Sequence, residues 1–86
     1  MRLARYVKFR EEKFGGVLFE TRSEKVYTLN PTAAAIVREI VAGTGEGDIV
    51  RRMKDRFDDR GVDIAREVAM LLEDLRGRGL VEDADG

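Results

Sequence analysis

The stretch KVYTLNPTAAAIV, from Lys25 to Val37, decides the fold because it joins a strand pattern directly to the start of a helix. The residues from Lys25 to Leu29 are rich in β-branched and aromatic side chains, which favour strands. Asn30 is a preferred N-cap, and Pro31 is favoured at the first helical position, where its missing N–H leaves no bond unmade. We therefore predict a strand that ends at Leu29 and a helix that begins at Pro31.

Two more strands are predicted upstream of this junction. Residues 5–10 partly alternate and contain aromatic and branched side chains, and residues 17–21 have high β propensity. Gly15 and Gly16 permit a bend before the second strand. A short polar connection at residues 22–24 joins the second strand to the third as a hairpin, so the N-terminal third is expected to form a three-stranded antiparallel meander.

Three helices are predicted downstream. The first is expected to end at Gly43 in the left-handed conformation, the second to cover residues 48–58 after a loop at 44–47, and the third to cover residues 64–78 with Asp63 as its N-cap. Leu80 and Val81 are expected to pack back on the core. The side chains predicted to face inward are Ala33, Ile36, Val37, Ile40, Ile49, Val50, Met53, Phe57, Ile64, Val68, Leu71, Leu72 and Leu75.

Length and composition limit the function. The 86 residues suit one domain, 1–86, and the 38% of charged residues with a formal net charge of -1 indicate a mixed-sign surface. The chain has no cysteine and no histidine, so we expect no catalytic residue, no cofactor and no metal site. No run approaches the roughly 18 apolar residues of a spanning helix, and we expect a cytoplasmic protein that contacts no membrane.

Charge clusters and glycine runs do not change this expectation. Asp55 with Asp58 and Asp59, and Glu73 with Asp74, are read as solvated faces, since adjacent helical residues diverge by about 100 degrees. The glycine-rich segments at 14–16 and 43–47 lack the Lys-Ser/Thr ending of a phosphate loop. A sequence pI near 5.5 argues against a dedicated nucleic-acid binder.

The third strand and the last helix form the candidate site. In a meander the third strand is an edge, and its unpaired N–H and C=O groups are a template for another strand. On the last helix, one shoulder beside the apolar face carries small residues next to Leu72 and a positive charge, which would leave a trough for peptide side chains. The alternative is that the alanines only permit close packing on the sheet. The shoulder consists of Ala65, Ala69, Leu72 and Arg76.

The order of elements resembles the PqqD-like peptide chaperones, which are the recognition elements of ribosomally made, post-translationally modified peptide pathways (RiPP recognition elements). The resemblance is carried by the Tyr-x-Leu-Asn junction at Tyr27, the alanine-rich helix start, the Gly43 stop, and the Leu-x-x-x-Gly-Leu-Val ending from Leu75 to Val81. It covers nearly the whole chain. The fold it implies is α+β, with a three-stranded antiparallel sheet followed by three helices in a winged-helix-like arrangement.

The resemblance also implies a function and a site. In that family the leader of a precursor peptide adds as a strand to the third strand and lies against the last helix, and the chaperone delivers it to a modifying enzyme, often a radical SAM protein. Carried over by position, this implies peptide binding by Lys25, Val26, Tyr27, Thr28, Leu29, Ala65, Ala69, Leu72 and Arg76. The charge of Arg76 would suit an acidic residue of the leader.

Two other functions remain open. A winged-helix DNA-binding regulator would use the basic residues of the second helix, although acidic neighbours offset them. A dimerisation module would pair the third strand with its own copy, because an exposed edge serves either purpose. The basic residues in question are Arg51, Arg52, Lys54 and Arg56.

Overall fold

The computed structural model describes residues 1–57 and 63–83 of the chain, and these form an α+β fold. Residues 58–62 and 84–86 lie outside the described part, and with them the predicted end of the second helix at residue 58 and the acidic residues Asp58 and Asp59. The elements, in chain order, are β1 (Arg2–Leu3), β2 (Val7–Glu12), β3 (Gly15–Glu20), β4 (Lys25–Leu29), α1 (Pro31–Val41), α2 (Glu46–Arg56), α3 (Ile64–Gly77) and β5 (Val81–Glu82). The predicted fold class, a three-stranded antiparallel sheet followed by three helices, is confirmed.

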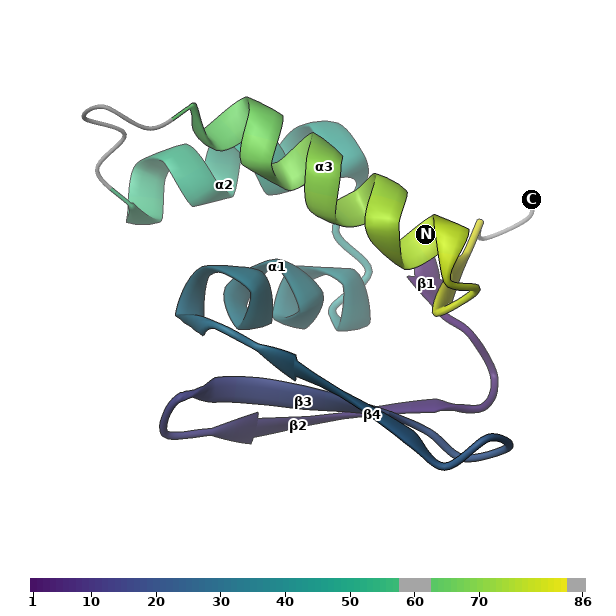
Figure 1. Cartoon of the computed structure of the whole chain (residues 1–86). Helices are drawn as coiled ribbons and strands as arrows, with labels where there is room; N and C mark the ends of the chain where they lie inside the picture. The colour runs from purple at the N-terminus through teal and green to yellow at the C-terminus, as the bar shows by residue number, and fades with distance from the viewer. Residues whose placement is uncertain (58–62, 84–86) are drawn as a thin grey trace.

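The sheet has the strand order β2-β3-β4, with both pairs antiparallel (Figure 1). Both ends of β2 and both ends of β3 differ from the predicted ranges, 5–10 and 17–21. β2 extends to Glu12, because Glu11 and Glu12 pair with Gly16 and Gly15. The two glycines therefore belong to β3 itself and do not form a bend in front of it. Residues 25–29 form β4 as predicted.

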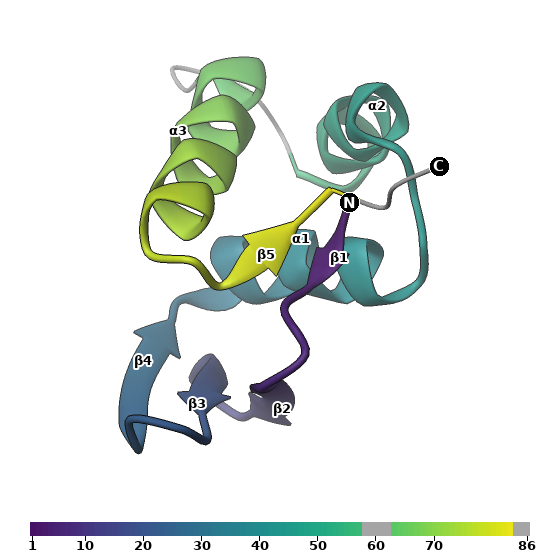
Figure 2. The same ribbon diagram turned by 90° about the vertical axis from the view of Figure 1, so that its right-hand side faces the viewer.

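The helices lie on one face of this sheet in two layers (Figure 1). α1 packs directly on the sheet, and α2 and α3 cover the other side of α1. The end view shows α3 on the same side of the molecule as β4, with α2 on the side away from it (Figure 2). This placement decides which flank of α3 faces the open strand.

The boundaries of α1 are those predicted from Asn30 and Gly43. The Asn30 Oδ1 accepts a hydrogen bond from the Ala33 N–H at 2.8 Å, as an N-cap should. At the other end Gly43 has a φ of 86°, its N–H bonds to the Ile40 carbonyl, and the next N–H, of Thr44, bonds to Glu39. These two bonds are the pattern of a Schellman C-cap.

The second helix begins earlier than predicted. α2 starts at Glu46, with Gly45 as its N-cap, so the predicted loop at 44–47 is shorter than expected. The physical reason is electrostatic, since Glu46 and Asp48 place two carboxylates in the first turn, where the helix dipole favours negative charge. Phe57 lies just past the helix and is partly buried.

The third helix is capped as predicted and then turns the chain back. The Asp63 Oδ1 accepts from the Arg66 N–H at 3.1 Å, and Gly79 adopts a φ of 73° after the C-cap Arg78. The chain then returns as β5, which pairs with β1 and brings the first and last strands side by side (Figure 2). This two-stranded sheet was not predicted, because strands of two residues carry no readable periodicity.

The core lies around α1, between the sheet and the outer helices. Five residues of α1 are buried, which explains its run of small side chains: they let the helix approach the sheet closely. Leu72 is fully in the core whereas Leu71 is only partly buried, so α3 is rotated slightly from the predicted orientation. The buried apolar residues are Val7, Leu18, Leu29, Ala34, Ala35, Ile36, Val37, Ile40, Ile49, Met53, Ile64, Val68, Leu72, Leu75, Leu80 and Val81.

Candidate functional site

The outer edge of β4 is open. Within residues 1–57 and 63–83, β4 pairs with β3 only, so one side of the strand has no hydrogen-bonded neighbour. Two large side chains alternate along it: Tyr27 packs against the core side, and Val26 is 58% exposed on the face that no helix covers. An open edge with exposed backbone groups is a template for another strand.

The hydrogen-bond register identifies which backbone groups point outward. Thr21, directly after β3, donates its N–H to the Tyr6 carbonyl at 2.8 Å, on the β2 side. The N–H and C=O of one residue in an antiparallel strand point to the same side, and the side alternates along the strand. The even-numbered residues of β3 therefore bond to β4, where their partners are Lys25, Tyr27 and Leu29. Val26 and Thr28 direct their N–H and C=O groups to the open edge.

A groove of about 420 Å³ runs between β4 and α3. Its lining combines buried leucines, such as Leu75 and Leu80, with the polar side chains of Asp74 and Arg78. Because α3 lies over the β4 side of the molecule, a strand added to β4 would place alternate side chains against this groove. The groove is lined by Leu18, Val26, Tyr27, Thr28, Leu29, Asn30, Ala33, Leu71, Asp74, Leu75, Arg78 and Leu80.

Arg78 crosses the groove between α3 and β4. Its Nε donates to both carboxylate oxygens of Asp74, at 3.1 Å each, and its guanidinium carbon lies 5.4 Å from the centre of the Tyr27 ring. The hydrogen bond and the charge of Asp74 raise the pKa of Arg78 above its ordinary value, so the side chain stays cationic. This residue therefore places a held positive charge beside the open strand.

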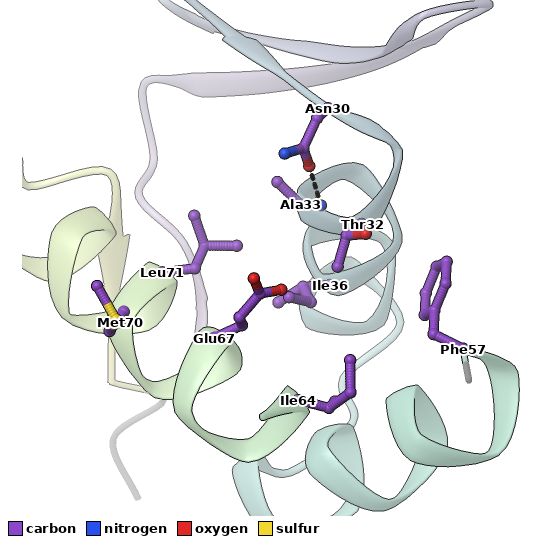
Figure 3. A pocket seen from close by; sticks show the side chains of 9 residues that line it. All are labelled: Asn30, Thr32, Ala33, Ile36, Phe57, Ile64, Glu67, Met70 and Leu71. Carbon is purple, nitrogen blue, oxygen red and sulfur yellow. Dashed lines mark hydrogen bonds between the residues drawn. The ribbon is translucent and has the colours of Figure 1, made fainter. Parts of the chain in front are cut away.

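A second pocket, of about 540 Å³, continues the groove past the end of β4 (Figure 3). The two share Asn30, Ala33 and Leu71. In Figure 3 the Glu67 carboxylate points toward Ile36, between α1 and α3. The complete lining is Asn30, Thr32, Ala33, Ile36, Phe57, Ile64, Glu67, Met70 and Leu71, which is mostly apolar and suits a hydrophobic side chain.

The structure brings together the strand half of the predicted site. Lys25, Val26, Tyr27, Thr28 and Leu29 form β4, and the last four line the groove. Leu29 is itself buried, at 6% exposure, and its backbone groups face β3, so only its neighbours in the strand are available at the open edge. Lys25 is exposed at the start of the strand.

The helix half of the predicted site does not lie beside β4. Leu72 is 2% exposed in the core, and Arg76 forms an ion pair with Glu46 of α2, on the flank turned away from the open edge. Ala69 lines a hollow on the outward face of α3 that shares Asp74 and Arg78 with the groove, and Ala65 lines neither the groove nor its extension. On this shoulder Leu72 lies in the core and Arg76 pairs with α2, and the contribution of these four residues to peptide binding stays a prediction.

The residues that wall the groove belong to the opposite shoulder of α3. They are Leu71, Asp74 and Arg78, spaced three and four apart on one face. The sequence contains this pattern, with Glu67 continuing it by one turn. Its importance is visible only once α2 and β4 are known to lie on opposite flanks of α3.

Other candidate sites find less support in the geometry. Arg52 pairs with Glu39 at 3.0 Å and Arg51 pairs with Asp48, so two of the basic residues of α2 are engaged by carboxylates. In the described part of the chain no three acidic side chains converge as metal ligands. No helix among these residues has the length and apolar character to cross a membrane.

The fold and this site define a class of small α+β domains with an open strand edge beside a helix-walled groove. The chain belongs to the PqqD family, because the family model described as coenzyme PQQ synthesis protein D matches residues 15–81. The predicted resemblance to PqqD-like RiPP recognition elements is thereby confirmed. No curated protein matches the sequence.

Two solved structures share the fold. One, described as lasso peptide synthetase B1 complexed with the leader peptide, is 26% identical with a TM-score of 0.80, and the match covers 95% of this chain and 96% of that one. The other, TbiB1 in complex with the TbiA(beta) leader peptide, is 18% identical with a TM-score of 0.84 over 100% of both chains. At 18% identity the second likeness shows the fold alone.

Proposed function

We propose that this protein binds the leader region of a ribosomally made precursor peptide by strand addition to β4 and presents it to a modifying enzyme. The observation that carries the proposal is the open edge of β4 beside the groove walled by α3. Main-chain bonds to Val26 and Thr28 would supply affinity, and the groove would supply selectivity. Family membership and a 26% identical relative described in complex with a leader peptide support it.

The binding residues in this proposal are the five of β4 together with Leu71, Asp74 and Arg78 of α3. Ala69 remains a candidate only at the outer rim, and Leu72 and Arg76 are not included, because one is buried and the other pairs with α2. The domain itself performs no chemistry in this proposal and acts in the cytoplasm as a single unit over residues 1–86.

The partner is proposed to be the enzyme that modifies the same precursor. Resemblance to PqqD-like chaperones favours a radical SAM protein, whereas the solved relative is described as part of a lasso peptide synthetase. Co-purification of the tagged chain with each enzyme encoded nearby, with and without the leader, distinguishes the two. We expect a complex with a radical SAM enzyme that is strengthened by the leader.

The direct test is a titration of isotope-labelled protein with the leader of a short precursor peptide encoded nearby, followed by amide chemical shifts. We expect the largest shifts at residues 25–29 and along the Leu71, Asp74 and Arg78 face of α3. If these amides stay still while another surface responds, the assignment of the site is wrong. A leader with a scrambled sequence is the control.

Pairing of β4 with a second copy of the chain is the alternative that the open edge favours. Sedimentation velocity over a hundredfold range of protein concentration tests it. We expect a monomer that becomes a one-to-one complex on addition of leader. A dimer that the leader fails to dissociate would favour the dimerisation module.

A further inference from the structure

We propose that Arg78 is a specificity-determining residue that binds a carboxylate of the peptide, so that the groove selects an Asp or Glu at the groove-facing position opposite Tyr27. The inference rests on the proposed function, because it assumes that a peptide strand occupies the edge of β4. It adds the chemistry by which one class of peptide is chosen over another.

The Arg78 side chain is held in position by contacts with Asp74 and Tyr27. Its Nε is used by Asp74 at 3.1 Å, and its guanidinium lies over the Tyr27 ring at 5.4 Å. Arginine has five N–H donors in a planar fork, and Asp74 takes only the one on Nε, so donors on Nη1 and Nη2 remain for another acceptor beside the Tyr27 hydroxyl, which also interacts with the guanidinium. Among the described residues no hydrogen bond from these nitrogens to a carboxylate is formed. The fork is therefore oriented before any ligand arrives.

The side chain of Arg78 lies in the groove beside β4. Arg78 and Tyr27 both line the groove beside β4, and Tyr27 faces the helix layer. In an antiparallel strand pair, residues directly opposite each other point to the same face of the sheet. A peptide residue opposite Tyr27 would thus point into the groove, toward Arg78. Arginine and carboxylate form strong, charge-assisted pairs in this arrangement.

The charges around the groove-facing position opposite Tyr27 favour an acidic peptide residue. Asp74 is the one acidic side chain that lines the groove, and Arg78 already engages it. Lys25 lies two residues before Tyr27, on the same face of β4, and adds a positive charge at that end. An incoming carboxylate is therefore favoured over an ammonium group.

Arg76 provides the matched comparison within the same turn of α3. It pairs with Glu46 and lies 3.8 Å from a carboxylate oxygen of Asp83, so its charge is already engaged on the α2 flank. Arg76 and Arg78 have similar side-chain exposures, 36% and 50%. They differ in position: Arg76 lies on the α2 flank, and Arg78 lies in the groove beside β4. The proposal predicts that only the residue beside β4 affects peptide selection.

The test is selection from a displayed library of randomised 12-residue peptides against the wild-type protein and the variants Arg78→Gln, Arg78→Glu and Arg76→Gln. We expect the wild type and Arg76→Gln to enrich Asp or Glu at one fixed position. Arg78→Gln should lose this preference, and Arg78→Glu should reverse it toward Lys or Arg. Circular dichroism melts of all four proteins verify that each is folded.

A double-mutant cycle then measures the pair itself. For one selected peptide, Arg78→Gln and replacement of the acidic peptide residue by its amide should each weaken binding about 3- to 10-fold, and both together should weaken it no further. Equal, additive losses would overturn the assignment of Arg78. So would an acidic preference that survives in Arg78→Gln.

The outcomes separate this inference from the proposed function. If peptides are enriched and shift the amides of residues 25–29 but show no dependence on Arg78, only the specificity role of Arg78 fails. If no enriched peptide shifts those amides, strand addition to β4 fails, and the role of Arg78 fails with it.

Discussion

At the scale of single residues, Gly15 allows the end of β4 to lie close to the start of β3. Its φ is 143°, a conformation that side chains rarely adopt, and a Cβ there would lie 2.1 Å from the Leu29 carbonyl oxygen. Glycine is required because the backbone at the end of β4 occupies the place of a side chain. The sequence shows two adjacent glycines but not which of them β4 approaches.

We expect Gly15→Ala to lower the free energy of unfolding by at least about 2 kcal/mol, since backbone strain and a clash with Leu29 add together. The control is Gly47→Ala in the first turn of α2, where a Cβ meets nothing within 4 Å and helix propensity predicts a stabilisation of up to about 1 kcal/mol. Urea unfolding measures both. Equal effects of the two substitutions would contradict this account.

Glu39 links the end of α1 to α2. Its carboxylate accepts a hydrogen bond from the Thr44 hydroxyl at 2.7 Å and pairs with Arg52 at 3.0 Å. The bond from Thr44 is the main reason that the pKa of Glu39 lies below its ordinary value of 4.5, with Arg52 adding to it and burial opposing it. The folded state therefore favours the ionised form.

The sign of the pH dependence follows from this lowered pKa. The stabilisation by Glu39 is fully present above the unfolded-state pKa, about 4.3, and is lost as the pH falls through the lower folded-state value. We expect Glu39→Gln to be less stable than the wild type at pH 7, with a difference that shrinks below about pH 4. Urea unfolding between pH 7 and pH 3 measures it. A difference that is constant with pH would show that the ionised form is not the one favoured by folding.

At the scale of elements, β4 has two sides with different tasks. Lys25, Tyr27 and Leu29 hold it to β3, while Val26 and Thr28 turn their backbone groups to the open edge. The strand itself was predictable from its residue types. Which residues point outward follows from the register, which adjacent strands decide together.

We expect Thr28→Pro to leave the fold intact and to weaken leader binding about 10-fold, because proline removes one outward N–H and obstructs the added strand. Tyr27→Pro is the matched comparison, since it removes an N–H that bonds to β3 and should destabilise the sheet. Thermal melts and peptide titration on both variants measure these effects. Unchanged affinity in a folded Thr28→Pro variant would contradict strand addition at this edge.

The orientation of α3 illustrates what periodicity leaves open. Its apolar stripe and both caps were predictable, yet the groove is walled by Leu71 and Arg78 and not by the shoulder with Leu72 and Arg76. An apolar stripe about 100° wide defines which face of α3 is buried. It does not define which flank lies beside α2 and which lies beside β4. Leu71 and Leu72 were both predicted to face inward, but only Leu72 is fully in the core.

At the scale of the whole molecule, the arrangement is a sheet, a central helix and two outer helices on one face (Figure 1). The chain carries 16 basic and 17 acidic residues, and its ion pairs spread over several elements. With a formal net charge of -1, the chain has no overall excess of positive charge for a polyanion. Recognition of a peptide backbone at one edge needs none.

We therefore expect leader affinity to change less than about 3-fold between 50 and 200 mM salt, because main-chain hydrogen bonds supply most of the affinity and salt screens only the one charged pair. A protein that contacts 6–10 phosphates would lose about 10³- to 10⁵-fold over this range. Fluorescence anisotropy with labelled leader and with labelled duplex DNA measures both. Tight, steeply salt-dependent DNA binding would favour the winged-helix regulator.

By itself the sequence determined the meander, the three helices, the N-caps Asn30 and Asp63, the helix stop at Gly43, and the strand that forms the open edge. These features depend on local propensity and on the conformations that single residues allow. Only the tertiary structure decided the pairing of β5 with β1, the outward-facing backbone of Val26 and Thr28, and the wall formed by Asp74 and Arg78. The reason is that the role of a helix flank or a strand edge depends on which elements pack beside it. In this fold α2 and β4 lie on opposite flanks of α3.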